Sequence, residues 1–181
     1  MAIVSKTDRN GVDVAIEKLQ QLLYPRLISR WDVSAVYTSH PRANKNKIEG
    51  DLIPEVSLDS KEYKEVFTND NVAVNSFWLV DNVRPYDPVQ EWFSHNVSLI
   101  FQADLVKLYG QSNRADEEFK NAIQNASKNY GGWDDFELIG VETGVDNVYR
   151  EFITDQIRFT DMSEMNVVRF NYMVKYTPEC T

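Results

Sequence analysis

Apolar residues recur with helical spacing near the N-terminus. Asn10 and Asp13 resemble a capping box, with aspartate in place of the usual glutamate. The helix that follows is expected to stop or kink at Pro25, because proline disfavours helical backbone at the residue before it. Arg26–Arg30 then forms a connector with some helical character, and a first strand is expected over Asp32–Tyr37. The apolar face of the helix comprises Val12, Ala15, Ile16, Leu19, Leu22 and Leu23.

A second helix is expected after the break at Tyr109-Gly110. Asn113 is placed as its N-cap, and Asp116, Glu117 and Glu118 put negative charge in the first turns, where the helix dipole favours it. Gly131-Gly132 closes the region. One face of this helix is apolar and comprises Ala115, Phe119, Ala122, Ile123 and Ala126.

Alternating or apolar runs predict strands elsewhere. Two of them, Lys61–Phe67 and Val72–Val80, are separated by the turn-rich tetrad TNDN and are interpreted as a β-hairpin. Met165–Tyr176 has the cleanest alternation, with Val168, Phe170, Tyr172, Val174 and Tyr176 on one face and Arg169, Asn171 and Lys175 on the other. Val145–Phe152 is either a short helix or an ordered turn. Further strands are expected over Ser94–Asp104, Phe136–Thr143 and Gln156–Phe159.

This order of elements predicts an α+β domain in which an antiparallel sheet packs one face against two main helices. The whole chain, residues 1–181, is interpreted as one domain. Residues 38–60 and 81–93 are expected to be long loops or arms within it. The first loop contains two prolines, a glycine and a basic cluster of Arg42, Lys45 and Lys47, and it is either an interaction arm or a solvated insertion.

Composition narrows the classes of partner. The formal net charge of −9 argues against a protein whose main function is to bind the phosphate backbone of nucleic acid, and it leaves room for a local basic patch. Cys180 is the one cysteine, so neither an intrachain disulfide nor a cysteine metal site can form. No secretory signal or membrane-spanning run is present. The chain is therefore expected in a reducing cytoplasm or in a particle assembled there.

Catalytic motifs are absent from the sequence. His40 lies in the expected loop, and His95 follows Ser94 on a strand, where neighbouring side chains point to opposite faces and cannot pair as base and nucleophile. Asp134-Asp135 suits a solvated turn better than a carboxylate site, and Asp146-Asn147 suits a cap. We expect a protein that is not an enzyme, with no cofactor or metal.

Several aromatic residues lie outside clean strand patterns. Tyr86, Trp92 and Phe93 lie in or beside the second loop, and Trp133 follows the double glycine. Aromatic side chains anchor interfaces because they bury a large area at low entropic cost. They either contact a partner, together with Arg84, or fold back over their own core.

A set of short motifs from Trp31 to Tyr176 resembles structural proteins of tailed bacteriophages. The resemblance is closest to small head–tail connection proteins of Bacteroidetes phages, including the crAss-like group, and the order of elements resembles that of tail terminator proteins. Those proteins have an N-terminal helix, an antiparallel sheet with a long hairpin, a second helix and a closing strand. The motifs are PRANKN after Ser39-His40, IPE at Ile53–Glu55, EYKEVF, SFWLVD, NVSLIFQADL, NRADEE, TGVDNVY and VVRFNYMVKYT.

The resemblance implies a virion structural protein that forms a six- or twelve-fold ring in the phage neck or upper tail. Such a ring would contact the portal or adaptor on one side and tail proteins on the other, and DNA would pass non-specifically through its lumen. It would assemble in the host cytoplasm, without a membrane. Two other classes stay open: a carbohydrate- or receptor-binding module at the virion surface, using Tyr86, Trp92 and Trp133, and a carboxylate-dependent hydrolase.

Overall fold

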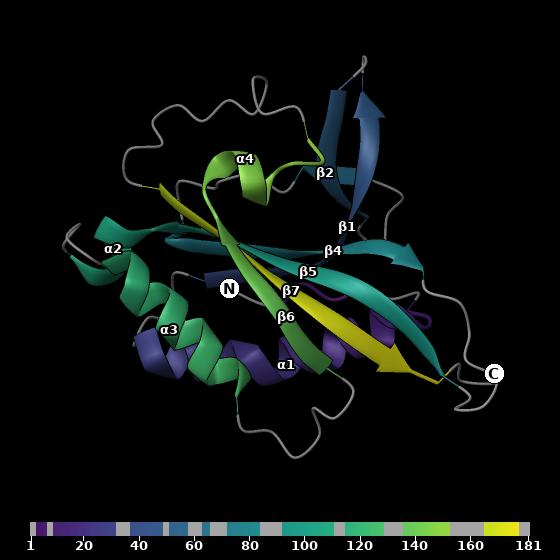
Figure 1. Cartoon of the computed structure of the whole chain (residues 1–181). Coiled ribbons are helices and arrows are strands. Elements are labelled where there is room, and N and C mark those ends of the chain that lie inside the picture. The colour runs from purple at the N-terminus through teal and green to yellow at the C-terminus, as the bar shows by residue number, and fades with distance from the viewer. Residues whose placement is uncertain are drawn as a thin grey trace.

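A computed structural model describes residues 3–6, 9–31, 37–48, 51–57, 63–65, 72–83, 92–110, 115–128, 136–152 and 165–177, with backbone alone at 45–48, 51–53, 57, 63–65 and 82–83. The described strands form a seven-stranded sheet in the order β3-β2-β1-β4-β5-β7-β6. Helices lie against this sheet, so the predicted α+β class is confirmed (Figure 1).

The elements alternate irregularly along the chain rather than in repeated units. Their bounds, in chain order, are α1 Val12–Trp31, β1 Tyr37–Ile48, β2 Asp51–Ser57, β3 Tyr63–Glu65, β4 Val74–Val83, β5 Phe93–Asp104, α2 Leu105–Tyr109, α3 Ala115–Ser127, β6 Phe136–Thr143, α4 Val145–Val148 and β7 Met165–Tyr176. The strands predicted at Ser94–Asp104, Phe136–Thr143 and Met165–Tyr176 are confirmed as β5, β6 and β7.

Helix α1 does not stop at Pro25 but continues to Trp31. The prediction of a connector over Arg26–Arg30 is therefore wrong. Pro25 is exposed, and so is Gln21, whose carbonyl loses its helical hydrogen bond to the proline and can turn to water instead. Leu27 and Trp31 extend the buried stripe beyond the proline, and their burial outweighs the missing hydrogen bond.

The first half of the sheet differs from the predicted arrangement. Residues 38–48 and 51–57, expected within a long loop, belong to strands β1 and β2, which pair as an antiparallel hairpin. The predicted hairpin between Lys61–Phe67 and Val72–Val80 is also wrong, because β3 pairs with β2 and β4 pairs with β1 and β5. The β1–β4 pair is parallel, so the sheet is mixed rather than antiparallel. A parallel pair needs a long crossover, and the excursion through β2 and β3 supplies it.

The second half of the sheet is antiparallel throughout. Strand β5 pairs with β4 on one side and with β7 on the other, and β6 covers the outer side of β7. The β5–β7 register is continuous from Phe93 opposite Tyr176 to Asp104 opposite Met165. Strand β6 is thus the edge strand at this end of the described sheet, and it contains a bulge between Leu138 and Gly140.

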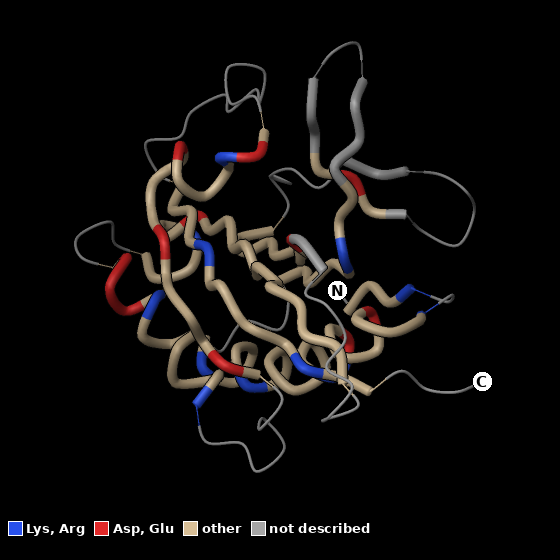
Figure 2. The backbone as a smooth tube through the Cα atoms, turned by 45° about the vertical axis from the view of Figure 1, so that its right-hand side comes forward, with Lys and Arg blue, Asp and Glu red and all other residues tan. Residues whose placement is uncertain are grey.

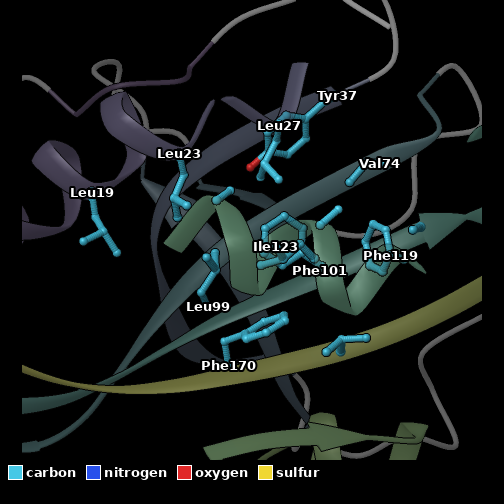
Figure 3. Packing of buried hydrophobic residues seen from close by; sticks show 14 of the residues in the cluster. Leu19, Leu23, Leu27, Tyr37, Val74, Leu99, Phe101, Phe119, Ile123 and Phe170 are labelled. Carbon is cyan, nitrogen blue, oxygen red and sulfur yellow. The ribbon is translucent and has the colours of Figure 1, made fainter. Parts of the chain in front are cut away.

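One face of the sheet carries the main core. Side chains from α1 and α3 share a buried cluster with residues of β1, β4, β5 and β7 (Figure 3). Trp31 of α1 stacks on Phe119 of α3 at 5.5 Å, and Phe101 of β5 meets Phe119 edge to face at 5.9 Å. The even-numbered residues of β7 that were predicted to share a face, from Val168 to Val174, all lie in this cluster.

The opposite face carries a second, smaller core. It combines Phe77 and Leu79 of β4 with Ile100 of β5 and with Val56 of the hairpin. Helix α4 and the turn after it lie over this face and add Val148, Tyr149 and Phe152. The helix predicted over Val145–Phe152 therefore ends at Val148, and the rest of that segment is a turn.

Short helix α2 was not predicted. Asp104 caps it by accepting a hydrogen bond from the Lys107 amide at 2.9 Å, and Gly110 ends it in the left-handed region at φ 69°. The predicted second helix is confirmed as α3, from Ala115. The predicted cap Asn113 and the predicted strand at Gln156–Phe159 lie outside the described residues, as do residues 84–91 of the second predicted loop.

Candidate interaction surfaces

The predicted basic cluster lies on strand β1. Lys45 and Lys47 are described by backbone alone, opposite Pro54 and Leu52 of β2. The Arg42 side chain turns toward α1, where its Nε lies 3.0 Å from Oδ1 of Asp13. Asp13 is buried and also accepts from Lys6 at 3.4 Å. Arg42 therefore anchors the hairpin strand to the start of α1, and its side chain is 32% exposed.

Of the four predicted contact residues in the aromatic and Arg84 group, Trp92 alone is described. Its ring is partly buried, and the Lys175 ammonium lies 5.0 Å from the ring centroid, within cation–π range. The adjacent Phe93 stacks on Tyr176 at 5.8 Å. Trp92 thus belongs to a group of side chains where β5 begins and β7 ends. Arg84, Tyr86 and Trp133 lie outside the described residues.

His95 is a buried residue of the main-core face. Its Nε2 lies 2.9 Å from the Tyr176 hydroxyl, and the two rings stack at 5.4 Å. Burial, assisted by the Arg42 charge, lowers the pKa of His95 below its usual value. Its Nδ1 has no hydrogen-bond partner within the described residues. The neighbouring Ser94 belongs to the opposite side of the strand by alternation.

Two of the carboxylates singled out in the sequence pair with a lysine of the same helix. Asp116 and Glu117 lie in the first turn of α3, and both form ion pairs with Lys120, the Asp116 pair at 3.8 Å. Asp146 and Asn147 lie within α4, whose N-cap is Gly144 without a side-chain cap hydrogen bond, so the predicted cap is wrong. Asn147 instead donates from Nδ2 to the carbonyl of Thr143 at 3.0 Å. Asp134 and Asp135 lie outside the described residues. Within the described part of the chain, no three His, Cys, Asp or Glu side chains are grouped to hold a metal ion.

The edge strand β6 presents the exposed apolar surface of the described chain. Leu138 is 38% exposed and Ile139 is 53% exposed, and these are the large hydrophobic residues classed as exposed there. The bulge leaves Ile139 without a partner in the β6–β7 register. An exposed edge with apolar side chains is a surface that other chains can cover. Sequence reasoning missed it, although the adjacent Leu138 and Ile139 interrupt the alternation of FELIGVET.

A polar cavity of about 290 Å³ adjoins Ile139 on the face that carries α4. Its lining includes Asp81, Glu142, Arg150 and Asn171. Each of these side chains has a partner: Arg150 donates to both Glu142 oxygens at 2.6 and 2.7 Å, and Asn171 donates to Glu142 at 3.0 Å. Asp81 accepts from Arg169 at 3.2 Å. These four side chains are thus paired in a network, whereas the buried Oδ1 of Asn96, which also lines the cavity, has no hydrogen-bond partner among the described residues.

Arg169 is the fully buried centre of that network. Its guanidinium donates to both oxygens of Glu151 at 2.6 and 2.7 Å, and its Nε donates to Ser98 and Asn171 at 3.0 Å each. The alternation of β7 placed Arg169 on the polar face but gave no sign that α4 and its turn would cover it. The partner Glu151 is 18 residues away in the chain.

Strands β1 and β6 differ in charge. Strand β1 contains three basic residues and no acidic one, whereas β6 contains two acidic residues, Glu137 and Glu142, and no basic one. Figure 2 shows where the charged residues of the described part of the chain lie. The segment that follows β6 contains two further acidic residues, Asp146 and Glu151, and one basic residue, Arg150. The β6 edge is therefore acidic and partly apolar, whereas β1, the inner strand of the hairpin, is basic and is paired with β2, which contains Asp51 and Glu55.

None of the described helices is long and apolar enough to cross a membrane. No protein-family model matches the chain, and no curated protein is significantly similar to it.

Proposed function

We propose that this chain is the subunit of a ring in the neck or upper tail of a tailed bacteriophage. The ring joins the portal or adaptor to tail proteins and lets DNA pass. The proposal begins from the motif resemblance described above. An N-terminal helix, a long hairpin, a second helix and a closing strand are also present here, as α1, β1–β2, α3 and β7. The role is structural rather than catalytic.

The observation that carries this proposal is the difference in charge between strand β1 and the edge strand β6. Closed rings use heterologous contacts, in which one surface of a subunit meets a different surface of the next. The β6 edge exposes Leu138 and Ile139 beside acidic residues, and the sequence of strand β1 contains Lys45 and Lys47. Apolar burial with opposite charge at its margin is the usual composition of such an interface.

The net charge of −9 suits passage of DNA. A ring repeats that charge around its lumen, and like charge repels phosphate, so DNA slides without binding. The same charge suits a protein that contacts nucleic acid without holding it.

The mass of the purified protein in solution tests the proposal directly. Light scattering after size exclusion is expected to give six or twelve times the 21.0 kDa subunit mass, with rings in negative stain. Ile139→Lys places a charge in the proposed contact and is expected to leave monomers with unchanged thermal unfolding. Asn121→Lys adds the same charge to the exposed face of α3 and is the matched control, expected to form rings normally.

Charge reversal on the hairpin is the complementary test. Lys45→Glu with Lys47→Glu is expected to weaken the ring, and wild-type rings are expected to loosen at high salt because exposed charge pairs are screened. A protein that stays monomeric up to millimolar concentration counts against the ring.

The alternative is a virion-surface module that binds carbohydrate or a receptor. It needs aromatic platforms with open faces, and one face of Trp92 is already occupied by Lys175. A monomer that binds glycans in a Trp92-dependent manner would favour this alternative over the ring.

A further inference from the structure

A second cavity, of about 350 Å³, lies between α1 and the ends of β6 and β7. Its apolar wall includes Val14 and Leu22 of α1, Phe136 of β6 and Tyr176 of β7. Two lysines also line it, Lys18 from the exposed side of α1 and Lys175 from β7. The cavity is separate from the polar network around Arg169 and shares no lining residue with it.

The charge of this cavity is opposite to that of the protein. Among the residues that the structure describes, no aspartate or glutamate lines it, and neither Lys18 nor Lys175 forms an ion pair. In a chain with a net charge of −9, two ammonium groups beside an apolar hollow form a local site for an anion.

The wall of the cavity is already in place. The Tyr176 hydroxyl is hydrogen-bonded to His95 at 2.9 Å, and the Tyr176 ring lies so close to Gly11 that a methyl group there would be 3.3 Å from it. Lys175 is held near the Trp92 ring at 5.0 Å. A site whose wall is held before binding costs little conformational entropy to occupy.

We propose that this cavity binds an acidic segment of a partner protein, with one apolar side chain in the hollow and carboxylates at Lys18 and Lys175. Ammonium groups from two different elements match a segment with two carboxylates better than a ligand with one. The volume accommodates one or two side chains and lies at the low end for small-ligand pockets. A neighbouring copy's basic strand β1 is unsuited to it, so this site is distinct from the proposed ring contact and does not depend on the ring.

Fluorescence anisotropy with a labelled peptide tests the proposal on the full chain. The probe is a dansyl-labelled amide of sequence Asp-Glu-Phe-Leu-Glu, and its matched control is Asn-Gln-Phe-Leu-Gln. Two exposed ion pairs are worth about a fivefold difference in Kd, and we expect the acidic probe to bind tighter by about that factor. The difference is expected to shrink at 0.5 M salt.

Variants locate the binding. Lys18→Gln with Lys175→Gln is expected to abolish the preference for the acidic probe. Lys128 is an exposed lysine directly after the end of α3, and Lys128→Gln is expected to leave the preference unchanged. Val14→Trp fills the hollow and is expected to weaken both peptides. Thermal unfolding verifies that each variant is folded. The proposal is overturned by equal binding of both peptides, by a preference that survives the double substitution, or by dodecanoate displacing the probe at lower concentration than the unlabelled peptide does.

Discussion

Arg169 and Glu151 form a two-bond ion pair across the face of the sheet that α4 covers. The guanidinium is fully buried in the middle of β7, and both of its terminal nitrogens donate to the carboxylate in the turn after α4. The same guanidinium reaches the Val148 carbonyl at 3.3 Å and Asp81 at 3.2 Å. This contact ties a four-residue helix, too short to be stable alone, to three strands of the sheet.

Loss of the carboxylate is expected to destabilise the fold. Glu151→Ala leaves the buried Arg169 charge with one remaining carboxylate, and we expect a loss of about 3 kcal/mol in the free energy of unfolding. Urea denaturation measures it. Glu142→Gln removes a carboxylate from the more exposed pair with Arg150 and is expected to cost less than about 1 kcal/mol. Equal effects of the two substitutions would show that the buried pair has no special role.

The helical segment after Pro25 is expected to be integral to the core. Leu27 is fully buried, and Leu27→Ala should cost about 2–5 kcal/mol because it leaves a cavity between α1 and the sheet. Ser29→Ala, on the exposed side of the same turn, should change stability by less than about 0.5 kcal/mol. Thermal unfolding of both variants compares them. A Leu27→Ala protein as stable as the wild type would mean that α1 effectively ends at the proline.

Acidification is expected to weaken the fold through His95. Its pKa is lowered in the folded state, so the unfolded chain binds the proton more readily. The contribution of His95 to stability is therefore complete above the unfolded pKa of about 6.5 and declines as pH falls toward the lower folded value. His95→Gln preserves a hydrogen-bond donor for Tyr176. Between pH 7.5 and pH 5.0, the free energy of unfolding of this variant should fall less than that of the wild type. If the stability of the variant and of the wild type falls in parallel with pH, the acid sensitivity comes from other groups.

Gly11 is expected to resist substitution for two separable reasons. It has φ 57°, and an added Cβ would lie 3.3 Å from the Tyr176 ring. Gly110 has a similar φ of 69° with no atom within 4 Å of its added Cβ. Gly110→Ala should therefore cost about 1–2 kcal/mol for backbone strain alone, and Gly11→Ala should cost more. Calorimetry compares them, and equal costs would show that the Tyr176 ring moves aside freely.

The elements that the sequence predicted well are those whose pattern is local. Strand β7 and helix α3 each bury a continuous stripe, so period and burial agree. The limits predicted for β7 are those observed, and every residue of the apolar face predicted for α3 is buried. The hairpin β1–β2 was not predicted, because its prolines and asparagines resemble a loop. Its base is held by contacts with distant residues, since Val56 lies in the second core with Phe152.

The sequence predicted the interaction surfaces less well than it predicted the fold. The basic residues of β1 were identified, but the ion pair of Arg42 with Asp13 joins two elements whose proximity no local pattern reveals. Leu138 and Ile139 can be identified as an interaction surface because the structure shows that β6 is the edge strand of the sheet. Lys18 and Lys175 are 157 positions apart in the chain and line one cavity because α1 lies across the end of β7.

The sequence alone determined the α+β class, the two main helices and the closing strand, because periodic burial of apolar side chains is a local property of the chain. The tertiary structure decided which strands are neighbours, which strand lies at the edge, and that Arg169 is buried while Ile139 is exposed. Those outcomes depend on pairings between distant segments, where hydrogen bonds and buried area are gained through contacts that no single window of sequence contains.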